Sequence, residues 1–131
     1  MATPTDSASG RPAATDVPGW VREHYRLVDA AEVDRYVEDF APGVRLRFAN
    51  NPVVVGREAA RAALARGHAH HDMAHTIVGC FESGATVTLE FEVAYTFRDG
   101  SQATVPSCAV IHRDADGRFD DVRIYLEMPA G

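Results

Sequence analysis

The segment GHAHHDMAHT, residues 67–76, holds four of the chain's six histidines: His68, His70, His71 and His75. Imidazole titrates near neutral pH and is also a common metal ligand. His71 is spaced from His68 and from His75 as neighbours on one helix face would be. However, the spacing matches none of the strong zinc patterns, and the adjacent His70 and His71 point apart in most conformations. The segment can be a metal site, an acid–base histidine with bystanders, or a histidine-rich helix end.

The flanking sequence divides this cluster. GREAARAALARG, residues 56–67, consists of strong helix formers and predicts a helix that Gly67 ends. HTIVGCF, residues 75–81, predicts a strand in which His75 shares a face with Ile77. We therefore expect the three earlier histidines to lie in an exposed polar linker, and we expect no metal site and no cofactor. His75 is either a satisfied core residue or an acid–base group at a pocket rim.

Carboxylates supply a second set of candidates. In TVTLEFEVAYTF, residues 86–97, Glu90 and Glu92 share one strand face with Ala94, opposite an apolar stripe of Leu89, Phe91, Val93, Tyr95 and Phe97. If the glutamates face inward, mutual repulsion and desolvation raise at least one pKa, as an acid–base carboxyl requires. The alternative is a solvated face. Asp29, at the end of the first expected helix, either caps the helix junction or orients a pocket histidine.

The elements that must position these groups follow from periodicity and turn residues. Asp16-Val17-Pro18 predicts the start of a helix with Asp16 as its cap, and residues 33–40 predict a second helix that Pro42-Gly43 ends. Strands are expected at 44–48, 75–81, 86–97, 102–112 and 118–127, with Gly-containing turns between the last four. The order predicts an α+β fold in which three N-terminal helices pack on a cone-shaped, curved antiparallel sheet. The open end of such a cone is a natural ligand pocket.

Composition narrows the function classes. The chain has 131 residues, 46% of them hydrophobic, as one globular domain requires. A formal net charge of −6 argues against nucleic-acid and anionic-membrane partners. No apolar run approaches the ~20 residues of a membrane span, and two cysteines indicate no disulfide framework, so we expect a cytoplasmic protein. Residues 1–16, rich in Pro, Ala, Ser and Thr, predict a disordered leader before a single domain at 17–131.

One family matches this arrangement over residues 17–129. The stretches YRLVDAAEVDRYVEDFAPGVRLRF, VVVGREAARAAL, HTIV, EFEVAYTFRDG, VPSCAV and RIYLE together resemble the SnoaL-like branch of the nuclear transport factor two-like superfamily. The resemblance implies a cystatin-like α+β barrel with a pocket between the first helices and the inner sheet face. It also implies a homodimer through the outer face, where we expect the Leu89, Phe91, Val93 and Tyr95 stripe. The superfamily includes polyketide cyclases, ketosteroid isomerase, limonene epoxide hydrolase, scytalone dehydratase and binding proteins, so it leaves the reaction open.

Individual positions carry over from these enzymes in part. His75 and Asp29 resemble a catalytic histidine and a helix aspartate of scytalone dehydratase, whose second histidine has no match here. Glu92 aligns with a catalytic aspartate of limonene epoxide hydrolase and Glu90 with its arginine, whereas its other aspartate is Ile124 here. No complete catalytic set is present.

These observations predict a cofactor-independent acid–base enzyme, a cyclase, isomerase or dehydratase, acting on a small and mostly apolar metabolite. His75 oriented by Asp29 would exchange the proton, and Glu92 would be the opposite partner. The expected pocket residues are Tyr25, Val28, Phe48, Glu90, Ala94, Val105, Ser107, Ile124 and Leu126. The rival is a non-catalytic dimeric binding or assembly module on the same fold; epoxide hydrolysis and metal binding are weaker alternatives.

Overall fold

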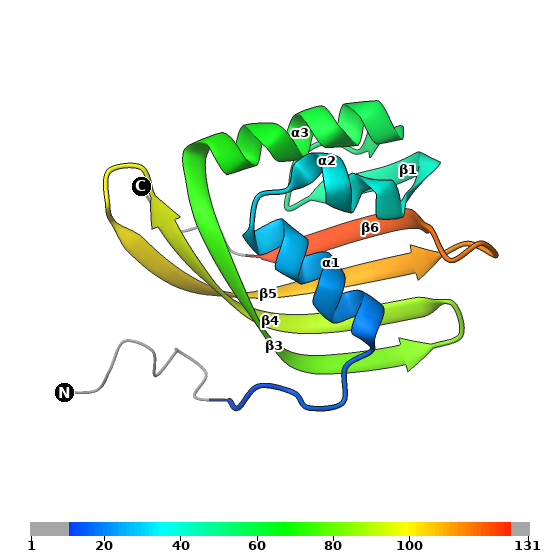
Figure 1. Ribbon diagram of the computed structural model, residues 1–131, viewed down its shortest axis with the longest axis horizontal. Coiled ribbons are helices and arrows are strands. Elements are labelled where there is room, and N and C mark those ends of the chain that lie inside the picture. The colour runs from blue at the N-terminus through cyan, green and yellow to red at the C-terminus, as the bar shows by residue number, and fades with distance from the viewer. Residues whose placement is uncertain (1–10, 127–131) are drawn as a thin grey trace.

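The computed structural model describes residues 11–126 (Figure 1). Its elements are α1 (Gly19–Asp29), α2 (Val33–Tyr36), the 3-10 turn η1 (Val37–Asp39), β1 (Phe40–Phe48), β2 (Val54–Val55), α3 (Arg57–His70), β3 (His71–Ser83), β4 (Thr86–Phe97), β5 (Gln102–Arg113) and β6 (Phe119–Leu126). The predicted order of helices and strands is confirmed, and β2 is an addition. Residues 1–10 of the expected leader, and Glu127 of the expected last strand, lie outside the described residues. Within the rest of the leader, the Ala14 N–H donates to the Ile77 carbonyl at 2.8 Å.

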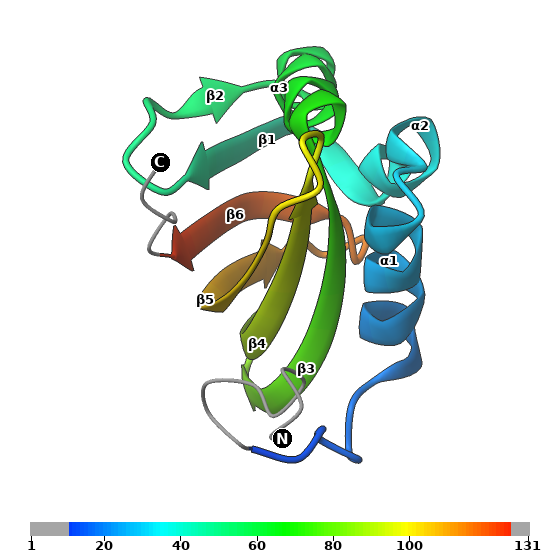
Figure 2. The same cartoon turned by 90° about the vertical axis from the view of Figure 1, so that its left-hand side faces the viewer.

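The strands form one curved, open sheet in the order β2-β1-β6-β5-β4-β3 (Figure 2). Strands β3 to β6 make the expected antiparallel meander. The prediction of a wholly antiparallel sheet is wrong, because β1 runs parallel to β6, with Leu46 beside Val122. A parallel pair needs a long crossover, and α3 with the meander supplies it here. The α+β class is confirmed, with a mixed sheet.

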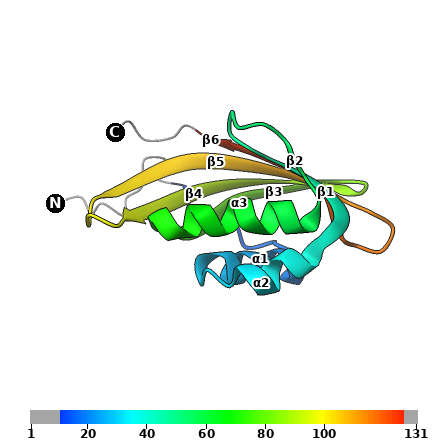
Figure 3. The same ribbon diagram turned by 90° about the horizontal axis from the view of Figure 1, so that it is seen from above.

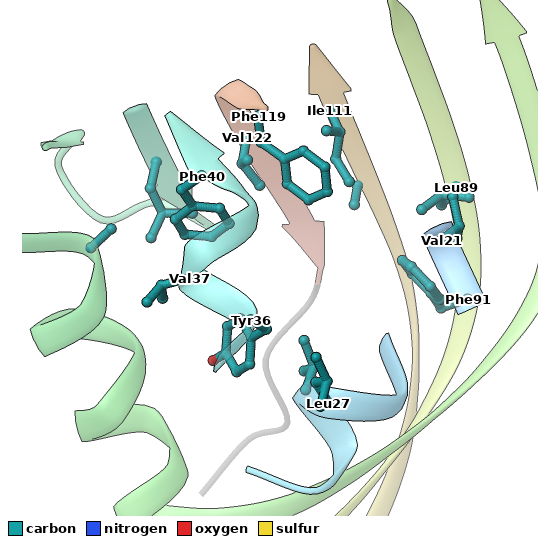
Figure 4. Packing of buried hydrophobic residues seen from close by; sticks show 14 of the residues in the cluster. Val21, Leu27, Tyr36, Val37, Phe40, Leu89, Phe91, Ile111, Phe119 and Val122 are labelled. Carbon is teal, nitrogen blue, oxygen red and sulfur yellow. The ribbon is translucent and has the colours of Figure 1, made fainter. Parts of the chain in front are cut away.

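All three helices lie on the same side of the sheet (Figure 3). Their apolar side chains meet the inner sheet face in one core, which includes Val21 and Leu27 of α1 and Leu89 and Phe91 of β4 (Figure 4). Leu89, Phe91, Val93 and Tyr95 are 0% to 3% exposed. The predicted apolar stripe of β4 is therefore the inner face, and its assignment to a dimer surface is wrong. Burying this apolar face against the helices removes far more apolar area from water than burying the opposite, polar face of β4 would.

The helix boundaries differ from the prediction at three points. α1 begins after Pro18 with no side-chain cap, so Asp16 does not cap it. α2 with η1 ends at Asp39, and β1 runs through Pro42-Gly43, where its register with β6 shifts. α3 passes through Gly67 to His70, because Gly67 does not adopt the left-handed backbone that ends a helix. Among residues 11–126, no helix is long and apolar enough to cross a membrane.

Candidate functional site

A cavity of about 580 Å³ opens between the helices and the inner sheet face. This volume lies within the range of small-molecule sites. Its walls are mainly apolar, and include Val28, Leu46, Phe48, Met73, Phe91 and Ile124. Five of the chain's six histidines also line it: His24, His68, His70, His71 and His75. An apolar cavity with several imidazoles can hold a small molecule and exchange protons with it.

His75 and Asp29 form a hydrogen-bonded pair at this cavity. The imidazole Nδ1 lies 2.6 Å from Asp29 Oδ1, and the His75 backbone N–H donates to Oδ2 of the same carboxylate at 2.9 Å. Asp29 is the last residue of α1 and His75 lies in β3, so the pair joins helix to sheet. A carboxylate accepting from Nδ1–H leaves the Nε2 lone pair of a neutral imidazole free to accept a proton. Within residues 11–126, no side chain bonds to this Nε2.

Aromatic rings hold the His75 imidazole in place. Its centroid lies 5.1 Å from that of Tyr25 and 5.0 Å from that of Phe91. Burial, followed by the charge of Asp29, raises the pKa of the Tyr25 phenol well above its usual value. Tyr25 therefore remains a neutral hydrogen-bond donor beside the imidazole, and it lines the same cavity.

A second imidazole–carboxylate pair was missed in the sequence. His24 Nδ1 lies 2.8 Å from Asp39 Oδ2, and His24 is 5% exposed. The available signal was the position of His24 within the apolar stripe of α1, three residues after Val21 and four before Val28. Asp39 could not have been paired with it, because the irregular η1 turn brings the two together.

The histidines beside α3 are part of the cavity wall. Tyr36 Oη and His68 Nε2 are hydrogen-bonded at 2.8 Å, and His71 packs edge-on against Tyr95 at a centroid distance of 4.8 Å. Burial lowers the pKa of both His68 and His71, and their mutual proximity contributes at His68. The expectation of an exposed linker is thus wrong for these two residues, because α3 continues past Gly67 and carries His68 to Tyr36. In residues 11–126, no three His, Cys, Asp or Glu side chains are grouped so that they could hold a metal ion.

The structure separates the predicted site residues into three groups. His75, Tyr25, Val28, Phe48, Ser107 and Ile124 line the cavity, and Asp29 bonds to His75. Val105 and Leu126 lie on the inner face but belong to the core rather than to the cavity wall. Glu90, Glu92 and Ala94 are on the outer face, because they alternate with the inward-facing Phe91 and Tyr95.

The prediction that Glu92 faces His75 across the pocket is therefore wrong. Glu92 is 6% exposed on the outer side of the sheet, and its Oε1 has no hydrogen-bond partner in the described part of the chain. Glu90 instead forms an ion pair with Arg11 at 3.0 Å. Neither carboxylate can reach a molecule in the cavity through the intervening sheet.

A family model for the SnoaL-like domain matches residues 21–122, which include both imidazole–carboxylate pairs of the cavity. The chain belongs to the SnoaL-like family. A search of curated proteins finds no match.

Solved structures of SnoaL-like and related proteins share the fold. A protein of Xanthomonas campestris pv. campestris described as a polyketide cyclase is 20% identical, with a TM-score of 0.77 over 83% of this chain and 88% of that one. An epoxide hydrolase of the LEH-like type from M. tuberculosis is 18% identical, with a TM-score of 0.71 over 82% and 79%. SalBIII, an epoxide hydrolase/cyclase-like enzyme of pyran ring formation in the polyether salinomycin, is 19% identical, with a TM-score of 0.69 over 82% and 88%. At these identities the likeness establishes the fold alone.

Proposed function

We propose that this SnoaL-like protein is an acid–base enzyme that needs no cofactor and that cyclises, isomerises or dehydrates a small, mostly apolar metabolite. The observation that carries the proposal is the His75–Asp29 pair, bonded at 2.6 Å, at the wall of an apolar cavity of about 580 Å³. The names of fold neighbours, which include a polyketide cyclase and SalBIII, support this substrate class.

In this mechanism, His75 Nε2 takes a proton from an acidic C–H or O–H of the bound molecule. Asp29 fixes the ring and stabilises the imidazolium that forms, as a carboxylate does in other hydrogen-bonded imidazole pairs. Tyr25, whose phenol remains protonated, donates a hydrogen bond to the oxygen on which negative charge develops. The apolar walls exclude water and strengthen both interactions.

The test is a panel of small apolar ketones, hydroxy ketones and epoxides, incubated with the wild-type protein and with His75→Gln. The matched control is His112→Gln, because His112 forms an equally short pair with Asp120, at 2.6 Å, on the exposed surface outside the cavity. We expect His75→Gln to lose turnover and His112→Gln to retain it. Unchanged turnover in His75→Gln would show that acid–base catalysis by this pair is wrong.

The rival function is a binding module without catalysis. Core side chains do not fill the cavity. A protein that served only for assembly would not need such a cavity, so the rival must bind a small molecule. Compounds of the panel that bind with a measurable heat, while none of them is converted, would favour the binding module.

We also propose that the protein forms a homodimer through the outer sheet face. Two large apolar side chains on this face are exposed, Phe81 at 58% and Tyr125 at 47%, and the ladders place them on the side of Glu90. Sedimentation velocity tests this: Tyr125→Lys should give monomers, and Ala115→Lys, in a turn, should not. A wild-type protein that is monomeric at all concentrations would contradict the proposal.

A further inference from the structure

The cavity wall holds a second imidazole bonded to a carboxylate, which the proposed function does not use. His24 Nδ1 bonds to Asp39 Oδ2 at 2.8 Å, in the same manner as His75 Nδ1 to Asp29. The His24 side chain is 6% exposed, whereas that of Asp39 is 46% exposed. A solvated carboxylate can hold the imidazole in one tautomer and stabilise its protonated form without itself being desolvated.

The His24 ring is rigidly positioned. It packs against Tyr36 at a centroid distance of 5.4 Å and against Phe119 at 4.9 Å. Figure 4 shows these two partners among the buried hydrophobic residues. Tyr25 lies 5.1 Å from the His24 ring and also 5.1 Å from the His75 ring. The His24 and His75 rings therefore both contact Tyr25 on the α1 side of the cavity. Their ring centroids are at most twice 5.1 Å apart.

The Nε2 atom of His24 keeps some accessible surface, at a residue that lines the cavity. His24 lines the cavity, and within residues 11–126 no group bonds to its Nε2. In the described residues, two fully buried side-chain polar atoms lack a hydrogen-bond partner: His71 Nδ1 and Glu92 Oε1. His24 Nε2 also lacks a partner but is not one of these fully buried atoms. Nε2 thus keeps accessible surface although the residue is 5% exposed. A purely structural histidine of this burial would be expected to have both nitrogens satisfied within the protein.

We infer that His24 is a second proton-transfer group of the same active site, held by Asp39 and acting opposite to His75. The inference rests on the proposed function of His75. In one turnover His75 Nε2 accepts a proton from a substrate C–H or O–H, and His24, entering as the imidazolium, gives its Nε2 proton to a basic atom of the same substrate. One bond to hydrogen breaks and one forms in the substrate, and exchange with water returns both histidines to their starting states.

The experiment is mild carbethoxylation of the wild-type protein by diethyl pyrocarbonate at about pH 8, where an imidazole of ordinary pKa is unprotonated and reacts at its free nitrogen. The modified histidines are located by mass spectrometry. Low conversion keeps the protein folded, and the exposed His112 serves as the internal reference. We expect His112, His75 and His24 each to gain one carbethoxy group. An unmodified His24 beside modified His75 and His112 would overturn the inference while leaving the role of His75 intact. An unmodified His75 would instead count against the proposed function itself.

A plug variant separates attack through the cavity from attack through the Asp39 side. Ser107→Phe places a ring in the cavity from β5, and the matched control Thr104→Phe places it on the exposed outer face of the same strand. We expect Ser107→Phe to protect both His24 and His75, and Thr104→Phe to protect neither. If His24 reacts equally fast in Ser107→Phe while His75 is protected, its open nitrogen does not face the cavity and the inference fails.

Discussion

His75 makes two hydrogen bonds to one carboxylate: its Nδ1 lies 2.6 Å from Asp29 Oδ1, and its backbone N–H donates to Oδ2 at 2.9 Å. The hydrogen bond from the His75 backbone fixes the orientation of the Asp29 carboxylate. The carboxylate in turn fixes the orientation of the imidazole ring. Asp29 ends α1, and the left-handed Ala31 (φ 59°) turns the chain away directly afterwards. The helix end therefore determines how the imidazole is presented to the cavity.

Asp29→Asn is expected to lower kcat/KM by about 10²–10⁴-fold, the range associated with one acid–base group. An amide can still accept one hydrogen bond, but it does not stabilise an imidazolium as a carboxylate does. The measurement is steady-state kinetics on any compound that the wild type converts. The control, Asp120→Asn, alters the exposed His112 pair and should leave kcat/KM unchanged. Equal kinetics for the two variants would contradict the role of Asp29.

Tyr25→Phe is expected to lower kcat by roughly 10²–10³-fold with little change in KM, as the loss of one donor to a developing oxyanion does. Burial raises the pKa of this phenol, so it is a donor throughout the working pH range. Tyr95→Phe is the matched control, because Tyr95 lines the same cavity but packs against His71 rather than His75. Comparable losses in both variants would indicate a general packing effect in place of hydrogen bonding.

Gly67→Ala is expected to stabilise the protein by about 0.5–1 kcal/mol, because alanine replaces glycine inside a helix. No atom lies within 4 Å of a Cβ added at Gly67. Gly100 is the matched control: its surroundings are equally open, but its φ is +89°. Gly100→Ala should destabilise the protein by about 1–2 kcal/mol, the cost of a left-handed backbone for an L-residue. Urea unfolding measures both changes, and a destabilised Gly67→Ala would place Gly67 at a helix end after all.

The sequence predicted the strands well where local signals determine them. The bounds of β4, Thr86–Phe97, are those of the predicted strand, because its alternation is unbroken and Gly84 and Gly100 adopt the left-handed backbone of the flanking turns. Gly67 misled the prediction, since glycine permits a left-handed residue without requiring one. The alternation of β4 also defined two faces without showing which one the helices cover, and the glutamates were consequently assigned to the cavity.

The sequence predicted a pair of site residues only where the position of each residue in its expected element singled it out. Asp29 was found because it ends α1. His75 was found because the sequence predicted a strand start there, although β3 begins four residues earlier, at His71. The His24–Asp39 pair depends on the path of η1, and the Tyr36–His68 pair on the length of α3 beyond Gly67. These contacts are decided by tertiary packing, which local periodicity does not encode.

The stability of the protein should fall as the pH drops below about 6.5, in part because of His68 and His71. Burial lowers the pKa of both imidazoles below their ordinary value of 6.5. Below pH 6.5 the unfolded chain therefore binds more protons at these residues than the folded protein does, and protonation favours unfolding. Their contribution is fully present above pH 6.5 and is lost as the pH falls toward the folded-state pKa values.

Urea unfolding midpoints measured between about pH 5 and pH 7.5 test this, in the range where histidine titrates. His68→Gln and His71→Gln should each show a shallower loss of stability on acidification than the wild type, whatever their stability at neutral pH. The slope is the informative quantity, because His68→Gln also removes the ring that bonds to Tyr36. Ala69→Gln, at an exposed position near the end of α3 that carries no titratable side chain, should keep the wild-type slope. If His68→Gln and His71→Gln also keep that slope, then neither imidazole is held neutral by the cavity wall.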